Sequence, residues 1–284
     1  MLPLLQKHAP WLAGFVLSVN FYLLPTVPAS PRATDLVGLL LAAWIVMRLA
    51  SGRQRPGPLV LLGLVALFPA GWLILSVVDG DPVTATQAGR WLVAVPWAAT
   101  LVVIVADGQG RDRFAWGLVV GGGVNVAVVL LQWVGFEWLL RLVGLSSSQS
   151  EFYHYVAQTV RLPGLHGQHN ASATVLSLAI PAAFYLYFRR RLGVPLLFGV
   201  LAGFLLVLHL TSTRSPLVVA VFTVAYAFVA ARQFARGLVI GSVLLAVVVP
   251  LLVIYGPPGG WSRWKDASAI NANVGERVDS NRGA

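Results

Sequence analysis

The sequence predicts an all-α protein, a polytopic integral membrane bundle of about nine transmembrane helices with its N-terminus in the cytoplasm. The first observation is composition: of 284 residues, 57% are apolar and only 11% are charged, and the mean hydropathy is +0.78. A soluble globular domain carries about 25% charged residues, so this chain lacks the charge to cover a surface that faces water. The other two observations are nine apolar segments and charges that alternate between the loops.

Each apolar segment approaches the length of a membrane-spanning helix, roughly 20 residues. Several are shorter, and we expect their helices to continue into the flanking residues. A leader peptide cleaved near Ala29 is the alternative for the first segment, but its length and the spans that follow favour an uncleaved span. In chain order the predicted spans are Trp11–Val27, Leu36–Arg48, Leu59–Val78, Trp91–Ala106, Phe114–Val134, Ala171–Phe188, Pro195–Leu210, Leu217–Ala231 and Leu238–Tyr255.

The loops between these spans form two alternating sets that differ in charge. One set carries eleven Lys and Arg against two Asp, and the other carries nine Lys and Arg against eight Asp and Glu. Cytoplasmic loops carry the excess of Lys and Arg, so the first set is predicted to be cytoplasmic. Most of the formal charge of +10 therefore reports topology and not a nucleic-acid surface. The cations of the first set are Lys7, Arg48, Arg53, Arg55, Arg111, Arg113, Arg189, Arg190, Arg191, Arg232 and Arg236.

Small residues and prolines within the spans predict how the helices pack. Glycines four residues apart let neighbouring backbones approach closely, and a proline inside a span kinks it. Apart from His209 near a span end, no predicted span carries an ionisable residue at mid-membrane, which argues against an ion-coupled transporter. The glycine pairs are Gly117 with Gly121 and Gly199 with Gly203, and the prolines are Pro69, Pro96, Pro181 and Pro250.

The longest connection between spans is the loop at residues 135–170, which is predicted to lie outside. Residues 137–143 are typical of a short amphipathic helix in the membrane interface. The last part of the loop gathers polar side chains just before the sixth span, where Asn170 or Ser172 is a candidate N-cap. A helix that begins here points its free N–H groups at the outer face, which favours anion binding. The plain alternative is an ordinary capped loop. The polar side chains are Arg161, His166, Gln168, His169 and Asn170.

A second polar loop, residues 210–216, joins the seventh and eighth spans on the same side. It is too short to leave the membrane surface, so Arg214 is held at a depth where a lone cation is costly. The neighbouring sequence offers no acid as a partner. A guanidinium binds phosphate through two parallel hydrogen bonds, so an anionic ligand is one interpretation. An Arg that extends to the aqueous interface is the other.

Both loops carry a resemblance to a known family. Arg161-x-x-Gly164 followed by Gln168-His169-Asn170-Ala171 resembles the first signature of the O-antigen ligase/polymerase superfamily. The segment from Leu210 to Arg214 resembles its second signature, the LT-x-S-R turn, with Ser212 and Thr213 where the family shows any residue and then Ser. The spacing of one span, an Arg-rich cytoplasmic turn and another span also fits. The resemblance is best over residues 161–231.

The resemblance implies a membrane glycosyltransferase of lipopolysaccharide biosynthesis, in the inner membrane of a bacterium. An O-antigen ligase moves a glycan from undecaprenyl pyrophosphate to lipid A–core, and an O-antigen polymerase moves it to another lipid-linked repeat. Related enzymes glycosylate a pilin. The implied partners are therefore the undecaprenyl-pyrophosphate-linked glycan, a glycan acceptor and membrane lipids, with no nucleic acid. Family members use no metal and no nucleotide, so no cofactor is expected.

The resemblance also assigns roles to residues. Arg161 and Arg214 would bind the pyrophosphate and stabilise it as the leaving group, and Gln168, Asn170 and Ser212 would complete the donor site. The family's general base is a His in a large outer loop further along, and nothing in this sequence matches it. His169, and His166 near it, are imidazoles that could act as the base here, and the alternative is that they only shape the loop.

The sequence divides into a transmembrane domain at residues 1–255 and the start of a periplasmic loop at residues 256–284. Residues 275–282 resemble the beginning of the family's large periplasmic loop. We therefore expect this sequence to be the front portion of a larger enzyme. Two alternatives remain: a flippase or other transporter of lipid-linked oligosaccharides, and an inactive fragment from a degenerate gene.

Overall fold

The computed structural model of the chain describes residues 2–19, 33–52, 57–80, 82–134, 164–166, 169–210 and 215–230, and a few single positions beyond them. In this part of the chain every element is helical, with eight α-helices, one short 3₁₀ helix and no strand. The all-α prediction is confirmed. The elements are α1 (Leu2–Ser18), α2 (Ala33–Ala50), α3 (Gly57–Val78), α4 (Pro82–Ala106), α5 (Gly108–Val134), η2 (Gly164–His166), α8 (His169–Phe188), α9 (Val194–Leu210) and α10 (Ser215–Ala230).

Eight of the predicted spans each correspond to one of these α-helices, although the bounds differ. Helices α1 and α4 begin nine residues before their predicted spans. Apolarity locates only the part of a helix that suits lipid, whereas Pro82 at the first position of α4 marks where the helix itself begins. The ninth predicted span lies almost entirely outside the described residues, and the predicted interfacial helix and the segment at 256–284 lie wholly outside them.

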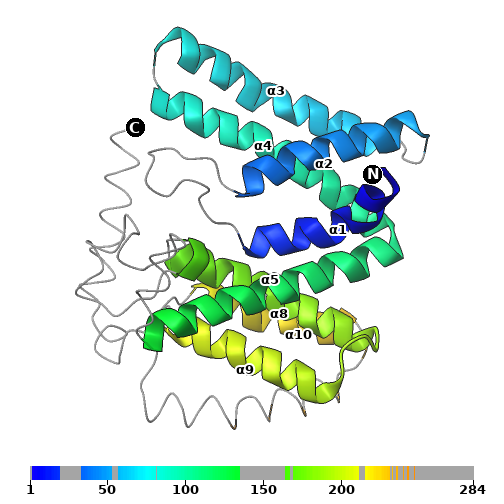
Figure 1. Cartoon of the computed structure of the whole chain (residues 1–284), viewed down its shortest axis with the longest axis vertical. Helices are drawn as coiled ribbons and strands as arrows, with labels where there is room; N and C mark the ends of the chain where they lie inside the picture. The colour runs from blue at the N-terminus through cyan, green and yellow to red at the C-terminus, as the bar shows by residue number, and fades with distance from the viewer. Residues whose placement is uncertain are drawn as a thin grey trace.

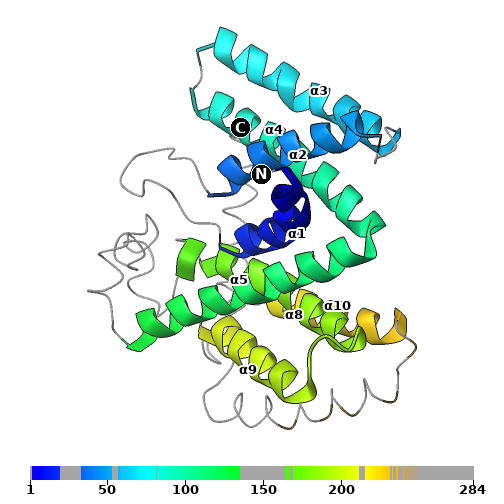
Figure 2. The ribbon, with the colours of Figure 1, turned by 45° about the vertical axis from the view of Figure 1, so that its right-hand side comes forward.

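Helix α5 crosses the middle of the molecule between two groups of helices (Figure 1 and Figure 2). The first group buries side chains of α1, α2 and α4 against one another, and Leu41 and Trp44 are among the most deeply buried. The second group forms a larger core from α5, α8, α9 and α10, which includes Leu176, Phe184 and Phe204. Helix α5 therefore links the two halves of the structure.

A glycine seam, made by Gly14, Gly117 and Gly121, joins α1 to α5. A Cβ on Gly117 would lie 2.7 Å from the backbone nitrogen of Phe15, and a Cβ on Gly121 would lie 2.7 Å from the Phe15 carbonyl oxygen. No larger residue fits at this distance, so the close approach predicted for this glycine pair is confirmed. The matching prediction for Gly199 is not borne out in the described part of the chain, where nothing lies within 4 Å of its Cβ position.

Helix α3 forms one edge of the molecule, where it packs against α4 (Figure 1). Large apolar side chains along it, among them Phe68, Ile74 and Val78, are exposed. Helix α5 is the one α-helix of the described residues that is long and apolar enough to cross a membrane by length and composition, and half of its most apolar window is buried in the structure. Shorter apolar stretches lie in α3, α4, α8 and α9.

Candidate functional site

The structure describes part of the predicted donor site. Arg161, Gln168, Ser212 and Arg214 lie outside the described residues. His169 and Asn170 are the first two residues of α8. The described part of the site is therefore the backbone around the start of α8, together with η2, the three-residue turn that lies between Arg161 and His169 in the sequence.

Two side chains of α5 hold the η2 turn through its backbone. Gln132 Oε1 accepts a hydrogen bond from the Gly164 N–H at 2.9 Å, and Gln132 Nε2 donates to the Gly164 carbonyl oxygen at 3.5 Å. Asn125 Oδ1 accepts from the Leu165 N–H at 3.0 Å. We call Asn125, Gln132, Gly164 and Leu165 the amide clasp. It fixes the backbone three residues after Arg161 and four residues before His169.

The amide clasp is buried, so its hydrogen bonds are shielded from water. Asn125 is 0% exposed and Gln132 is 5% exposed. A buried backbone N–H without an acceptor costs about 1–3 kcal/mol, and the two amides supply that acceptor for both N–H groups. The Asn125 Nδ2 has no hydrogen-bond partner in the part of the chain that the structure describes. Because this nitrogen is buried, it is a cost of the clasp and not an exposed donor.

Gly164 is required at its position for two reasons. Its φ of 63° lies in the left-handed region, which a side chain makes costly. A Cβ there would also lie 2.5 Å from Ser172 Oγ and 2.7 Å from Asn125 Oδ1. Ser172 is buried in the first turns of α8 and faces this glycine. The prediction of Asn170 or Ser172 as N-cap is wrong, because α8 already begins at His169 and both residues lie inside it.

Sequence reasoning missed the two clasp residues of α5. An ionisable side chain inside an apolar segment is the usual signal of a functional site, whereas Asn125 and Gln132 are neutral. A usable signal was present: these two polar residues lie seven positions apart in an otherwise apolar stretch, which places them on one face of a helix. Polar side chains on one face of an apolar helix join it to a neighbouring segment.

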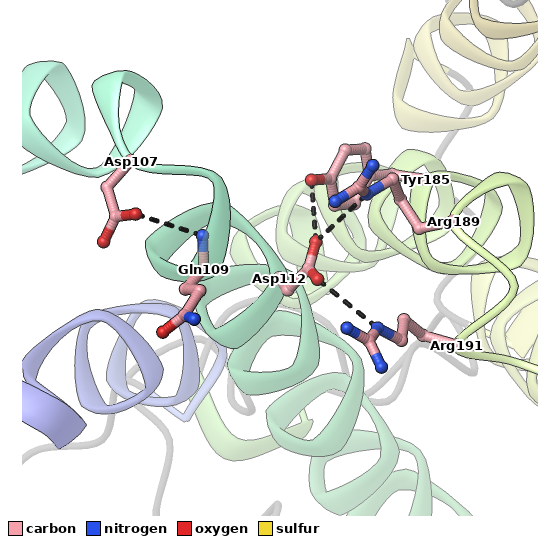
Figure 3. A network of polar contacts seen from close by, with 6 residues as sticks. All are labelled: Asp107, Gln109, Asp112, Tyr185, Arg189 and Arg191. Atoms are coloured by element: carbon pink, nitrogen blue, oxygen red, sulfur yellow. Dashed lines mark hydrogen bonds and ion pairs between the residues drawn. The ribbon is translucent and has the colours of Figure 1, made fainter.

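The other end of the α5–α8 pair is joined by charged groups (Figure 3). Asp112 Oδ1 lies 3.6 Å from Arg189 Nε, and Asp112 Oδ2 lies 3.5 Å from Arg191 Nε. Asp112 Oδ1 also accepts a hydrogen bond from the Tyr185 hydroxyl at 2.8 Å. We call Asp112, Tyr185, Arg189 and Arg191 the arginine clamp. Its two arginine side chains are 55% and 63% exposed.

Close to the arginine clamp, α1 and α5 begin side by side. Arg113 Nη1 donates to the Lys7 carbonyl oxygen at 2.7 Å. Asp107 caps α5, because its Oδ1 accepts from the Gln109 N–H at 3.1 Å. The three segments around residues 7, 111–113 and 189–191 were predicted to share one side of a membrane, and they lie together in the structure.

Comparisons of the chain with protein-family models, with curated protein sequences and with solved structures find no match. The family resemblance therefore rests on the residues of the two polar loops alone. Among the residues that the structure describes, no group of three His, Asp or Glu side chains is placed to hold a metal ion. The described part of the site offers backbone groups for binding. These are the N–H groups in the first turn of α8, a helix of 20 residues, next to the η2 turn that the amide clasp holds.

Proposed function

We propose that the chain is a multi-pass protein of a bacterial inner membrane that binds an undecaprenyl-pyrophosphate-linked glycan and transfers the glycan to lipid A–core or to another lipid-linked repeat. The observation that carries the proposal is the amide clasp. It uses two buried polar side chains to hold a three-residue turn, and that turn lies between Arg161 and His169, two residues of the motif that predicts the donor site.

Two observations support the membrane part of the proposal. Large apolar side chains are exposed along α2, α3, α5 and α10, although a soluble monomer rarely exposes contiguous apolar patches larger than a few hundred Å². Three of the basic segments predicted to be cytoplasmic also lie together, at the start of α1, the start of α5 and the turn after α8. The nine-span topology with a cytoplasmic N-terminus accounts for both.

The start of α8 suits a pyrophosphate. The first turn of a helix leaves N–H groups without an internal partner and carries a partial positive charge, so it favours anions. Arg161 and Arg214 are proposed to bring guanidinium groups to the same anion, each able to make two parallel hydrogen bonds to phosphate oxygens.

The proposed reaction is a displacement at the anomeric carbon of the donor glycan. The acceptor hydroxyl gives its proton to His169 and its oxygen forms the new glycosidic bond. The bond from the anomeric carbon to the pyrophosphate oxygen breaks, and undecaprenyl pyrophosphate leaves with the electron pair. Arg161 and Arg214 stabilise the negative charge that develops on the leaving group, which lowers the barrier because they bind that charge more strongly than the uncleaved donor.

Glycan transfer in bacterial membranes that lack their own ligase tests the proposal. The full-length protein is expected to restore the lipopolysaccharide ladder on a gel, and Arg214→Ala in that protein is expected to abolish the ladder. Arg90→Ala, which removes a cation from α4 and not from the proposed donor site, serves as the control and should leave the ladder intact. Unchanged ladders with Arg214→Ala, or no transfer by the wild type, would contradict the enzymatic assignment.

A further inference from the structure

The turn after α8 places an arginine where a glycine is usually found. The Arg191 N–H donates to the Leu186 carbonyl oxygen at 2.8 Å, and the Arg190 N–H donates to the Tyr187 carbonyl oxygen at 2.9 Å. This pair of hydrogen bonds is the Schellman motif, which ends a helix with one residue in the left-handed conformation. That residue is Arg190, with a φ of 55°.

A side chain makes this conformation less favourable than it is for glycine. The Arg190 side chain is exposed and has no ion-pair partner among the described residues. Neither burial nor pairing in the described structure compensates for the cost. Arg190 is thus a residue that the fold alone does not favour at its position.

Arg190 belongs to a basic patch that three segments build together. The patch contains six cations and two carboxylates, which gives it a formal charge of +4. Asp112 pairs with Arg189 and Arg191, whereas the exposed Lys7 and Arg111, like Arg190, have no carboxylate within ion-pair distance in the described chain. The residues of the patch are Lys7, Asp107, Arg111, Asp112, Arg113, Arg189, Arg190 and Arg191.

Apolar side chains lie directly beside the patch. Val194 and Leu196 in the first turn of α9 are 49% and 54% exposed. Tyr187 and Phe188, at the end of α8, are partly buried next to the arginines. An exposed cationic surface that borders exposed aliphatic side chains matches a phospholipid, because such a ligand presents a phosphate next to an acyl chain.

We propose that this basic patch binds the headgroup of an anionic phospholipid, with Arg190, Arg111 and Lys7 at the phosphate and Val194 and Leu196 at the acyl chain. The inference rests on the proposal that the chain spans a membrane and is independent of glycan transfer. Each basic side chain near an anionic surface contributes about a fivefold factor in binding. Loss of the three unpaired cations should therefore weaken lipid binding on the order of a hundredfold.

Arg190→Gly separates a structural role from a binding role, because the two roles predict opposite signs. Glycine relieves the left-handed conformation, so the lipid-free melting temperature of the purified full chain in a neutral detergent should stay the same or rise. Added phosphatidylglycerol should raise the melting temperature of the wild type. This lipid-induced shift should shrink in Arg190→Gly and be lost in the triple variant Lys7→Gln, Arg111→Gln, Arg190→Gly.

Arg90→Gln provides the matched control, since it removes the same charge far from the patch. Position 90 lies about 24 Å along α4 from the Ala106 end, the end that leads into the first turn of α5. Its lipid-induced shift should equal that of the wild type. A full phosphatidylglycerol shift in the triple variant overturns the proposal, and so does an equal shift of the wild type with phosphatidylcholine or with inorganic phosphate.

Discussion

The two ends of the α5–α8 pair are joined by different chemistry. At one end the amide clasp uses neutral, buried side chains that bond to the backbone of a turn 32 and 40 residues away in the sequence. At the other end the arginine clamp uses one carboxylate and two exposed arginines (Figure 3). Buried hydrogen bonds are costly to lose, whereas exposed ion pairs contribute little. The clasp is therefore built to hold one conformation, and the clamp leaves its charges available to the surroundings.

The largest effect is expected from Gly164→Ala. The alanine must keep the φ of 63° that Gly164 has, and its Cβ would lie 2.5 Å from Ser172 Oγ. The conformational cost is about 1–2 kcal/mol and overpacking adds about 1–3 kcal/mol. Thermal melting of the purified chain measures the loss. Gly52→Ala is the matched control, because Gly52 has a φ of 66° but no described residue within 4 Å of its Cβ position. Equal losses in the two variants would show that the turn is not packed against α5.

A smaller effect is expected from Asn125→Leu, which keeps the size of the side chain but removes the acceptor of the Leu165 N–H. A buried N–H left without a partner should lower the free energy of unfolding by about 1–3 kcal/mol. Denaturation of the purified chain measures it. Thr100→Val is the control: Thr100 is as deeply buried, but its hydroxyl donates to the Pro96 carbonyl oxygen of its own helix. If both variants lose the same stability, the clasp has no special role in holding the turn.

The smallest effect is expected from Asp112→Asn, which removes both ion pairs of the arginine clamp and keeps an acceptor for the Tyr185 hydroxyl. Because the arginines are mostly exposed, stability should fall by less than about 1 kcal/mol. The difference from the wild type should shrink further in high salt, which screens exposed charges. Melting curves at low and high sodium chloride measure both effects. A loss as large as that of Asn125→Leu would remove the contrast between the two ends.

Much of the fold follows from the sequence, because long apolar segments separated by charged loops predict helices with little ambiguity. The glycine seam was also predictable at Gly117 and Gly121, since small residues four apart mark a close helix contact. Gly199 shows the limit of that rule: its spacing is the same, yet no described residue lies within 4 Å of its Cβ position. Spacing reveals which residues share a face, but it does not reveal which segment lies opposite.

The candidate site was predicted less completely for a related reason. The polar cluster before the sixth span drew attention to the residues around Gly164. The residues that hold this turn, Asn125 and Gln132, lie in a different helix, α5. Only the folded chain shows that their side-chain amides reach Gly164 and Leu165. Likewise, the charge distribution placed Asp112 on the same side as Arg189 and Arg191, but it did not indicate that one carboxylate bonds both arginines.

The affinity of the purified chain for undecaprenyl pyrophosphate is the most direct test of the proposed donor site. We expect the wild type to bind, and we expect a loss of about tenfold or more in both Arg161→Ala and Arg214→Ala, because each removes a charged hydrogen-bonding group from the pyrophosphate. Undecaprenol, which has the same hydrocarbon chain and no phosphate, should bind much more weakly. Equal affinity of the wild type and the two arginine variants for undecaprenyl pyrophosphate would contradict the account.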